Sequence, residues 1–522
     1  MGFIFPNKTR IKKTLVCVLL FIFCCWKTTA DDSVLDQSID ILKSKGSVYD
    51  LLNKISESSG MLFIYDGKTI ENNRRAKLEG GKTTIKQDIL DVIHDPQIEM
   101  KVIGRHILLQ KPSASPAKML HHPLDSIKPP SSYLTIEGKI RDNKTFELLA
   151  FVSVRVEENG VGTVANQNGH FLLKIPDSLA TKEIIFSHIG YETQKIPSEL
   201  LIGNYTDIYM NVEVIPIQEV IVSLVNPLKV IKNMLDKRSE NYMNEPALLT
   251  TFYREGIEYR KEFVSLTEAV FRIYKLPIES SLTDKVKLLK MRKISKANEN
   301  DSLSIKFKAG VHSSIALDIV KNLPDFLILN DENVYNYTKI DMAMMDSRLA
   351  HVIFFEQKPE LKDPYYKGEL YIDTETSALL GARFEINSEH IKKANHFVVR
   401  QSKNIVISPK EAIYTVSYKE LNGKFYLNYI RGDMSFDVNK KKWIISSSST
   451  VHTYFEMVSC KIETNDIKPF PSKENLPTSK IFSETKFTYD PDFWDDFNTI
   501  LPEQKISDNS IQISAKIEQK IE

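Results

Sequence analysis

Cysteine is scarce in this 522-residue chain, which contains four. Three of them, Cys17, Cys24 and Cys25, lie within the first 30 residues, and the fourth is Cys460. If the N-terminal segment is removed, one remaining cysteine cannot form an internal disulfide, so the domains must be stabilised by their cores. Cys460 ends a strand-like run, and we interpret it as a buried structural thiol rather than a nucleophile.

An excess of charge of one sign is also absent. The formal net charge is +1, from 69 basic and 68 acidic side chains. This balance indicates neither a nucleic acid nor a membrane surface as the partner. The sequence also lacks the zinc motifs H-E-x-x-H and H-x-x-E and the G-x-S-x-G nucleophile elbow. We therefore expect no catalytic residues, no cofactor and no metal site.

A metal site is the less favoured interpretation of two clusters of potential ligands. His121-His122 lies in a proline-rich stretch. Near Phe493 and Trp494, four carboxylates could hold calcium, although such a stretch more often packs its aromatic rings while the acids face water. These acids are Asp490, Asp492, Asp495 and Asp496.

The N-terminus predicts export. A basic region precedes an apolar run from Thr14 to Trp26, and Thr28-Thr29-Ala30 offers small residues for cleavage after Ala30. This order is typical of a secretory signal peptide. We expect a mature protein in the periplasm or at the periplasmic face of the outer membrane. A lipoprotein cleaved at Cys24 or Cys25 is the less favoured alternative, because Phe21, Ile22 and Phe23 stand where a lipobox needs small residues.

Residues 31–111 predict a small α+β domain. Ser47 is placed to cap a helix that Gly60 ends, a second short helix is expected from Thr84 to Val92, and a hairpin turns at Gly104-Arg105. The runs V-Y-D-L-L-N-K-I, G-M-L-F-I-Y-D and I-G-R-H-I-L-L-Q resemble the secretin and TonB short N-terminal domain. That resemblance implies a periplasmic docking module. An unrelated small α+β domain is the alternative.

After a proline-rich linker at 112–132, residues 133–222 show short strands separated by turns. Val152, Val154 and Val156 alternate with polar residues, and Asn168-Gly169 predicts a hairpin turn. The ordered runs G-K-I-R-D, A-F-V-S-V, G-T-V-A-N-Q-N-G-H-F and H-I-G-Y-E resemble the carboxypeptidase-regulatory-like, transthyretin-like β-sandwich of Bacteroidetes-type envelope proteins. The resemblance implies an accessory domain and not the zinc-dependent catalytic domain. Asn166 and Asn168 stand where that family often has acidic residues, so the resemblance implies no cation site here.

Residues 223–245 predict a connecting helix opened by Asn226-Pro227, with Leu228, Ile231, Met234 and Leu235 on its apolar face. Residues 246–500 contain many strand-like runs, a hairpin turn at Asn422-Gly423 and one helix from Ile315 to Leu323. We expect one large curved antiparallel sheet, followed by a disordered tail at 501–522. The predicted fold class is therefore mostly β and multidomain. Residues Tyr366 to Ile386 resemble the LolA-like half-barrel, and the wider region resembles an uncharacterised C-terminal region of Bacteroidetes envelope proteins.

Alternating aromatic residues in this sheet predict an apolar groove, with Phe354, Tyr371, Phe425 and Tyr429 as candidate ligand or partner contacts. The favoured function is a non-enzymatic docking and binding protein of the cell envelope. Its expected partners are envelope proteins, including TonB-linked outer-membrane components, and an apolar ligand; no nucleic acid is expected. The alternative is a secreted hydrolase or processing enzyme, whose cavity should gather carboxylates, histidine or serine.

Overall fold

The structure is a computed structural model that describes residues 34–65, 70–111, 133–213, 225–259, 262–295, 306–307, 310–330, 334–394, 398–400, 405–441, 446–477 and 497–503. The chain divides into two units, Met1–Pro123 and Leu124–Glu522. The sandwich and the β-rich region fall in the same unit. The expected mostly β, multidomain fold class is confirmed. The predicted leader, the His121-His122 pair and the carboxylates near Trp494 lie outside the described residues.

The first unit is a small α+β domain. Its second helix begins after Thr84, whose side chain accepts a hydrogen bond from the backbone N–H of Gln87. Ser47 caps the first helix and Gly60 ends it at a φ of 71°, as the sequence predicts. Ser47 also forms a capping box with Asp50. Its elements are α2 (Val48–Ser59), α3 (Ile85–Ile93), the antiparallel pairs β1 (Ser38–Ile41) with β5 (Gly81–Thr84) and β2 (Ser44–Ser47) with β4 (Arg75–Leu78), and β7 (His106–Gln110) between parallel β3 (Leu62–Tyr65) and antiparallel β6 (Glu99–Ile103).

The second unit begins with the predicted sandwich. Phe171 and Phe186 meet edge to face in its core, with ring centroids 5.4 Å apart. One difference from the expected antiparallel pattern is that β14 runs parallel to β8. Between β11 and β14 the chain passes through β12 and β13 of the other sheet before it returns to pair with β8. The elements are β8 (Tyr133–Asp142), flanked by β11 (His170–Pro176) and β14 (Tyr205–Met210), the sheet β10 (Gly162–Val164), β9 (Ser153–Val156), β12 (Glu183–Ser187) and β13 (Gln194–Pro197), and the short helix α4 (Ser198–Leu201).

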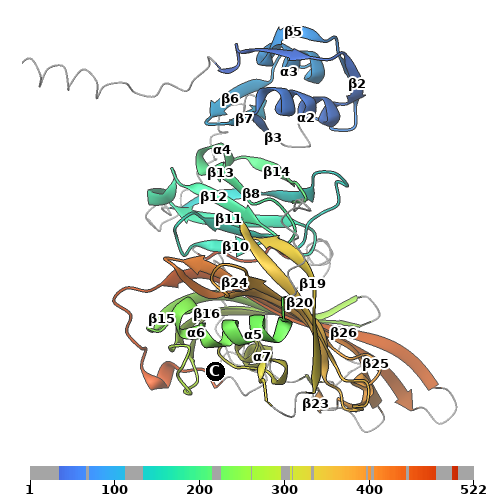
Figure 1. The fold of residues 1–522 in the computed structure, drawn as a ribbon, viewed down its shortest axis with the longest axis vertical. Helices are drawn as coiled ribbons and strands as arrows, with labels where there is room; N and C mark the ends of the chain where they lie inside the picture. The colour runs from blue at the N-terminus through green and yellow to red at the C-terminus, as the bar shows by residue number, and fades with distance from the viewer. Residues whose placement is uncertain are drawn as a thin grey trace, which may run out of the picture. The chain divides into compact units, whose positions relative to one another are not determined.

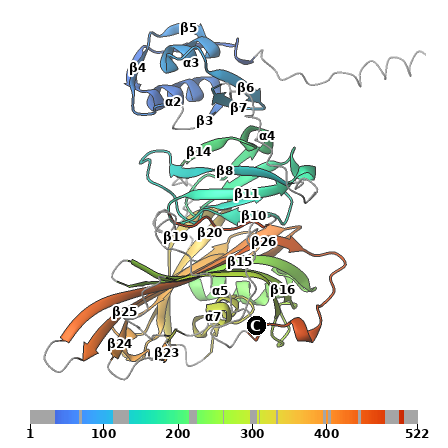
Figure 2. The same ribbon diagram turned by 180° about the vertical axis from the view of Figure 1, so that it is seen from behind.

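The rest of the second unit is built on a ten-stranded antiparallel sheet, shown in Figures 1 and 2. In spatial order its strands are β17 (Lys285–Ser295), β16 (Glu262–Lys275), β15 (Ala247–Tyr259), β26 (Ser446–Glu463), β25 (Lys424–Lys441), β24 (Ile405–Leu421), β22 (Leu379–Ile386), β21 (Tyr366–Asp373), β20 (Arg348–Gln357) and β19 (Tyr335–Met345). A two-stranded pair, β18 (Lys306–Phe307) with β23 (Val398–Arg400), stands apart. The expected single large sheet is confirmed.

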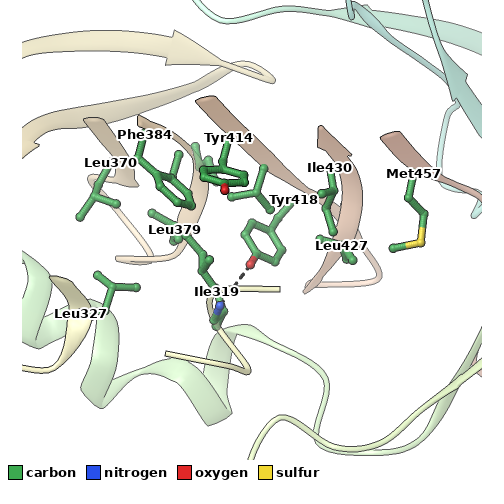
Figure 3. Close-up of a cluster of buried hydrophobic side chains, with 14 of the residues drawn as sticks. Ile319, Leu327, Leu370, Leu379, Phe384, Tyr414, Tyr418, Leu427, Ile430 and Met457 are labelled. Atoms are coloured by element: carbon green, nitrogen blue, oxygen red, sulfur yellow. Dashed lines mark hydrogen bonds between the residues drawn. The ribbon is translucent and has the colours of Figure 1, made fainter. Parts of the chain in front are cut away.

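Three helices, α5 (Pro227–Asp236), α6 (Arg238–Asn241) and α7 (Gly310–Ala316), belong to this part of the unit, and α5 and α7 lie along one side of the sheet in Figures 1 and 2. Figure 3 shows Ile319 and Leu327 packed against sheet residues that include Phe384, Tyr414 and Ile430. The main hydrophobic core of the unit therefore lies between this face of the sheet and the helical segments.

Two details of the predicted helices are wrong. The helix expected from Ile315 to Leu323 instead ends at Ala316 and is followed by turns. The carboxylate of Asp318 accepts a hydrogen bond from Tyr418 at 2.9 Å and pairs with Lys275 at 2.5 Å. These contacts hold the segment after Ala316 against the sheet in a turn conformation instead of a helix. In α5, Leu228 is 41% exposed, and Val230 joins Ile231 and Met234 on the buried face instead.

Candidate functional site

The face of the sheet opposite the helices meets the sandwich, and a partly open cavity of about 580 Å³ lies at this junction. The sandwich contributes residues that include Phe151, Ser153 and His188, and the rest of the wall comes from the β19–β20 turn and from β21, β22, β24, β25 and β26. Strands of the sheet and loops of the sandwich that are far apart in the sequence thus form one site.

The β19–β20 hairpin tip fixes the sandwich over the cavity. Asp346 and Ser347 both have positive φ, 53° and 61°, so the tip is a tight turn. The Asp346 carboxylate lies 2.7 Å from the guanidinium of Arg155 on β9. The backbone N–H of Gly190 donates to the carbonyl of Met344 at 2.8 Å. These bonds hold two walls of the cavity in register.

Lys419 on β24 is the most unusual residue of the lining. It is 4% exposed, and its Nζ donates to the carbonyl oxygen of Ser459 at 2.8 Å. Burial lowers its pKa to about 8, from an ordinary value of 10.5, because a charged ammonium is less well solvated there. No described carboxylate forms an ion pair with it. Sequence pattern alone does not indicate this residue, since one lysine in a strand carries no motif.

Arg431 on β25 occupies another part of the wall and is fully compensated. Its guanidinium donates to both carboxylate oxygens of Asp433, at 2.6 and 2.7 Å, and to Glu456 at 3.2 Å. It also lies over the ring of Phe151 at 5.0 Å. Burial opposes ionisation of Asp433, but His452 and Arg431 together lower the pKa of that carboxyl. At this end of the cavity, the charges of Arg431 and Asp433 therefore compensate each other.

A second buried ion network continues from it towards residues 497–503. Arg254 contacts Glu268 at 2.6 Å and Glu456 at 3.1 Å, and it donates to the carbonyl of Ile500 at 2.6 Å. The side chain of Asn498 bonds both the N–H and the carbonyl of Lys174 on β11, at 2.6 and 3.0 Å. The segment 497–503 thus joins the sandwich to the sheet.

Two of the four predicted groove residues line the cavity. The hydroxyl of Tyr371 donates to Glu369 at 2.6 Å, and the ring of Tyr429 stacks on Phe151 with centroids 5.5 Å apart. Phe425 is instead buried in the main core beside Tyr242, and Phe354 on β20 is half-buried. Neither belongs to the described lining, so the structure brings together Tyr371 and Tyr429 only. Ligand binding by any of the four stays a prediction.

The lining mixes the features that were expected to separate a binding protein from an enzyme. Apolar side chains include Ile189, Met345 and Val416. Neither of the two lining histidines is seen bonded to a serine or threonine hydroxyl that it could activate. His188 contacts the carbonyl of Ile189 at 3.1 Å, and His452 contacts the carboxylate of Asp433 at 3.4 Å. No pairing of a nucleophile with a base is therefore visible among the described residues of this wall.

Cys460 lies beneath the segment 497–503. It is buried, its Sγ donates to the carbonyl of Asn498 at 3.1 Å, and burial raises the pKa of the thiol to about 12. A thiol with this pKa is a poor nucleophile at neutral pH, in agreement with the structural role expected for it.

Within the described ranges, no three His, Cys, Asp or Glu side chains gather in a way that could hold a metal ion. None of the helices described has the length and apolarity needed to cross a membrane.

Comparison with protein families identifies one domain. The CarboxypepD_reg-like domain family matches residues 136–222, which is the sandwich, so the resemblance inferred for this part of the chain is confirmed. This domain type is a regulatory-like module that is distinct from a catalytic carboxypeptidase domain. The match covers less than half of the chain. No curated protein matches the chain at a significant level.

Solved structures offer distant likenesses only. A domain from Vibrio parahaemolyticus, described as belonging to an outer membrane lipoprotein-sorting protein, is 8% identical over 47% of this chain and 95% of its own, with a TM-score of 0.21. A DUF1329 family protein from Desulfovibrio piger is 10% identical over 46% of this chain and 95% of its own, with a TM-score of 0.20. Lipovitellin is 6% identical over 44% of this chain and 27% of its own, with a TM-score of 0.22. Scores this low carry no argument about function.

Proposed function

We propose that this protein is a non-enzymatic, exported binding module of the cell envelope, whose cavity between sandwich and sheet holds a ligand. The observation that carries the proposal is the cavity itself. Its volume of about 580 Å³ falls within the range of roughly 300–1,000 Å³ that is typical of small-molecule sites. Its wall combines apolar side chains with a few buried polar groups, which is the usual composition of such sites.

The compartment and the docking role rest on the sequence. The basic and apolar N-terminal run up to Ala30 is that of an exported protein. Residues 31–111 resemble the secretin and TonB short domain, and the first unit contains the helices α2 and α3 together with short strands. We assign this unit to docking on envelope proteins, including TonB-linked outer-membrane components, and the second unit to ligand binding.

The ligand-binding part is tested by purifying the full mature chain from its native envelope and identifying co-purified small molecules by mass spectrometry. Ser417 is half-exposed in the cavity wall, so Ser417→Trp should fill the cavity without disturbing the main core. We expect the wild type to retain a ligand that Ser417→Trp lacks, at an unchanged melting temperature. Identical small-molecule content in both proteins would overturn the proposal for the cavity.

The docking part is tested separately by crosslinking in intact cells. A mature N-terminus at Asp31 and crosslinks from residues 34–111 to envelope proteins are expected. A protein that stays in the cytoplasm, or whose first unit crosslinks to no envelope protein, would contradict this part.

A further inference from the structure

The charges in the cavity wall do not balance. The carboxylate of Asp346 is compensated by Arg155, and that of Asp433 by Arg431. The two remaining cations of the lining, Lys419 and Arg383, have no carboxylate partner among the described residues. Arg383 is exposed to solvent and Lys419 is buried, so Lys419 is the buried cation of this wall for which the described residues provide no ion-pair partner.

An unpaired ammonium is unfavourable in a buried position, since desolvation of one ion costs several kcal/mol. The Lys419 ammonium can donate three hydrogen bonds, and one is accounted for, to Ser459. Because Lys419 lines the cavity, its remaining N–H donors are available to a bound molecule. A negatively charged group in the cavity would supply the missing counter-ion.

Other polar groups of the wall lie close to Lys419 along the sheet. Ser417 is two residues away on β24, and the β24–β25 register shifts next to it, so that Asn428 is the extra residue of a bulge. The Nδ2 of Asn428 lies 3.4 Å from the hydroxyls of both Ser153 and Ser417. Bonds of this length are weak, so these groups can turn to an anionic ligand at little loss.

The rest of the wall suits an apolar body. Phe151 and Ile189 come from the sandwich, and Met345 and Tyr371 come from the β19–β20 turn and from β21. We propose that the cavity binds an amphipathic anion, a molecule with one carboxylate-like head group and an apolar body, and that Lys419 is its anchor. This inference rests on the proposed function, because it assumes that the cavity is a ligand site.

The test uses the full mature chain and three probes of equal chain length: decanoate, decanol and decyltrimethylammonium. Isothermal titration calorimetry should show decanoate binding at least tenfold more tightly than the other two. Lys419→Met removes the charge and keeps an apolar chain of similar length, and Lys419→Gln keeps a donor for Ser459. Both should weaken decanoate binding at least tenfold and leave decanol binding unchanged.

Lys410 provides the matched control, because it is an exposed lysine on the same strand that does not line the cavity. Lys410→Met should bind decanoate as the wild type does. Decanoate binding that survives in both Lys419 variants, or that equals decanol binding, would overturn the anchor while leaving the cavity as a ligand site. If neither decanoate nor decanol binds, and Ser417→Trp behaves as the wild type does, the proposed function of the cavity fails together with the anchor.

Discussion

Arg254 and Lys419 are both buried cations of the large sheet, and they differ in the number and charge of their hydrogen-bond partners. Arg254 has two carboxylates and two backbone carbonyls as partners, from Glu268, Glu456, Ile500 and Leu501. Lys419 has a single carbonyl partner. Because a buried charge is stabilised only by its partners, the two side chains should contribute to stability with opposite sign.

The Arg254 network predicts a large loss of stability when one carboxylate is neutralised. Glu456 contacts Arg254 and Arg431, each with a side chain 6% exposed or less. Glu456→Gln leaves both guanidinium groups undercompensated and should lower the free energy of unfolding by about 3–5 kcal/mol. In urea titrations, Glu463→Gln should lose less than about 1 kcal/mol, since its partner Arg272 is 39% exposed. Equal losses for the two variants would contradict this assignment.

The lowered pKa of Lys419 predicts a pH dependence. Between pH 8 and 10.5 the unfolded lysine keeps its proton while the folded one releases it, so the unfolded state binds more protons and stability rises with pH. Relative to Lys419→Met, the wild type should therefore gain up to about 3 kcal/mol across this range. Below pH 8 the full penalty remains. The groups that influence this titration are Cys460, Arg155 and Asp346.

The measurement is urea denaturation of both proteins at several pH values, with Lys410→Met as a control for general effects of alkaline pH. A difference between wild type and Lys419→Met that does not change with pH would show that the buried ammonium is not desolvated.

At the scale of the element, local chemistry was predictable where a turn or cap depends on one or two residues. The N-cap at Ser47 and the hairpin at Asn422-Gly423 were predicted correctly, and so was the strand character of β24 and β25. The helix at Ile315 was misplaced because Asp318 is held by Lys275 and Tyr418, and those contacts are long-range.

The cavity could not be predicted in the same way. Alternation in β24 indicates that Ser417 and Lys419 share a face, but it does not say what covers that face. The cover is the sandwich, whose position depends on Arg155, Asp346 and Asn498. Alternation places Phe425 and Tyr429 on the same face of β25, but the bulge at Asn428 lies between them. Phe425 therefore lies on the core side, whereas Tyr429 lines the cavity.

The Asn422-Gly423 turn gives a prediction at this scale. Gly423 has a φ of 75°, and a Cβ there would meet nothing within 4 Å, so the cost of Gly423→Ala is backbone strain alone. It should lower the free energy of unfolding by roughly 1–2 kcal/mol, measured by urea denaturation. Asn422→Gly, at a φ of 53°, should change stability little. A neutral Gly423→Ala would mean that the turn relaxes to another type.

At the scale of the whole molecule, the sandwich and the large sheet form one unit and residues 34–111 belong to another. The segment 497–503 bonds the sandwich through Asn498 and Asn166 and the sheet through Arg254. Leu501 and Pro502 take part in these bonds, so the predicted start of a disordered tail at residue 501 is wrong for these two residues. The second unit should therefore unfold as one cooperative body.

Hydrogen exchange followed by mass spectrometry at increasing urea tests this division. Sandwich and sheet peptides should lose protection at one urea concentration, and peptides from 34–111 at a different one. Asn498→Ala removes two bonds to Lys174 and should shift the first transition to lower urea without moving the second. Independent unfolding of sandwich and sheet would contradict the single-unit description.

The order of strands in the sheet constrains how the chain reaches this structure. β15, made early, pairs with β26, which is made after all the other strands of the sheet. Until β26 pairs with it, β15 keeps an open edge, and unpaired edges invite aggregation. The sheet strands β19, β20, β21, β22, β24 and β25 each pair with an adjacent strand of this series along the chain and can form earlier. In refolding experiments, pulse-labelled amides of these strands should become protected before those of β15, so that closure of the β15–β26 seam is the last and slowest step of folding.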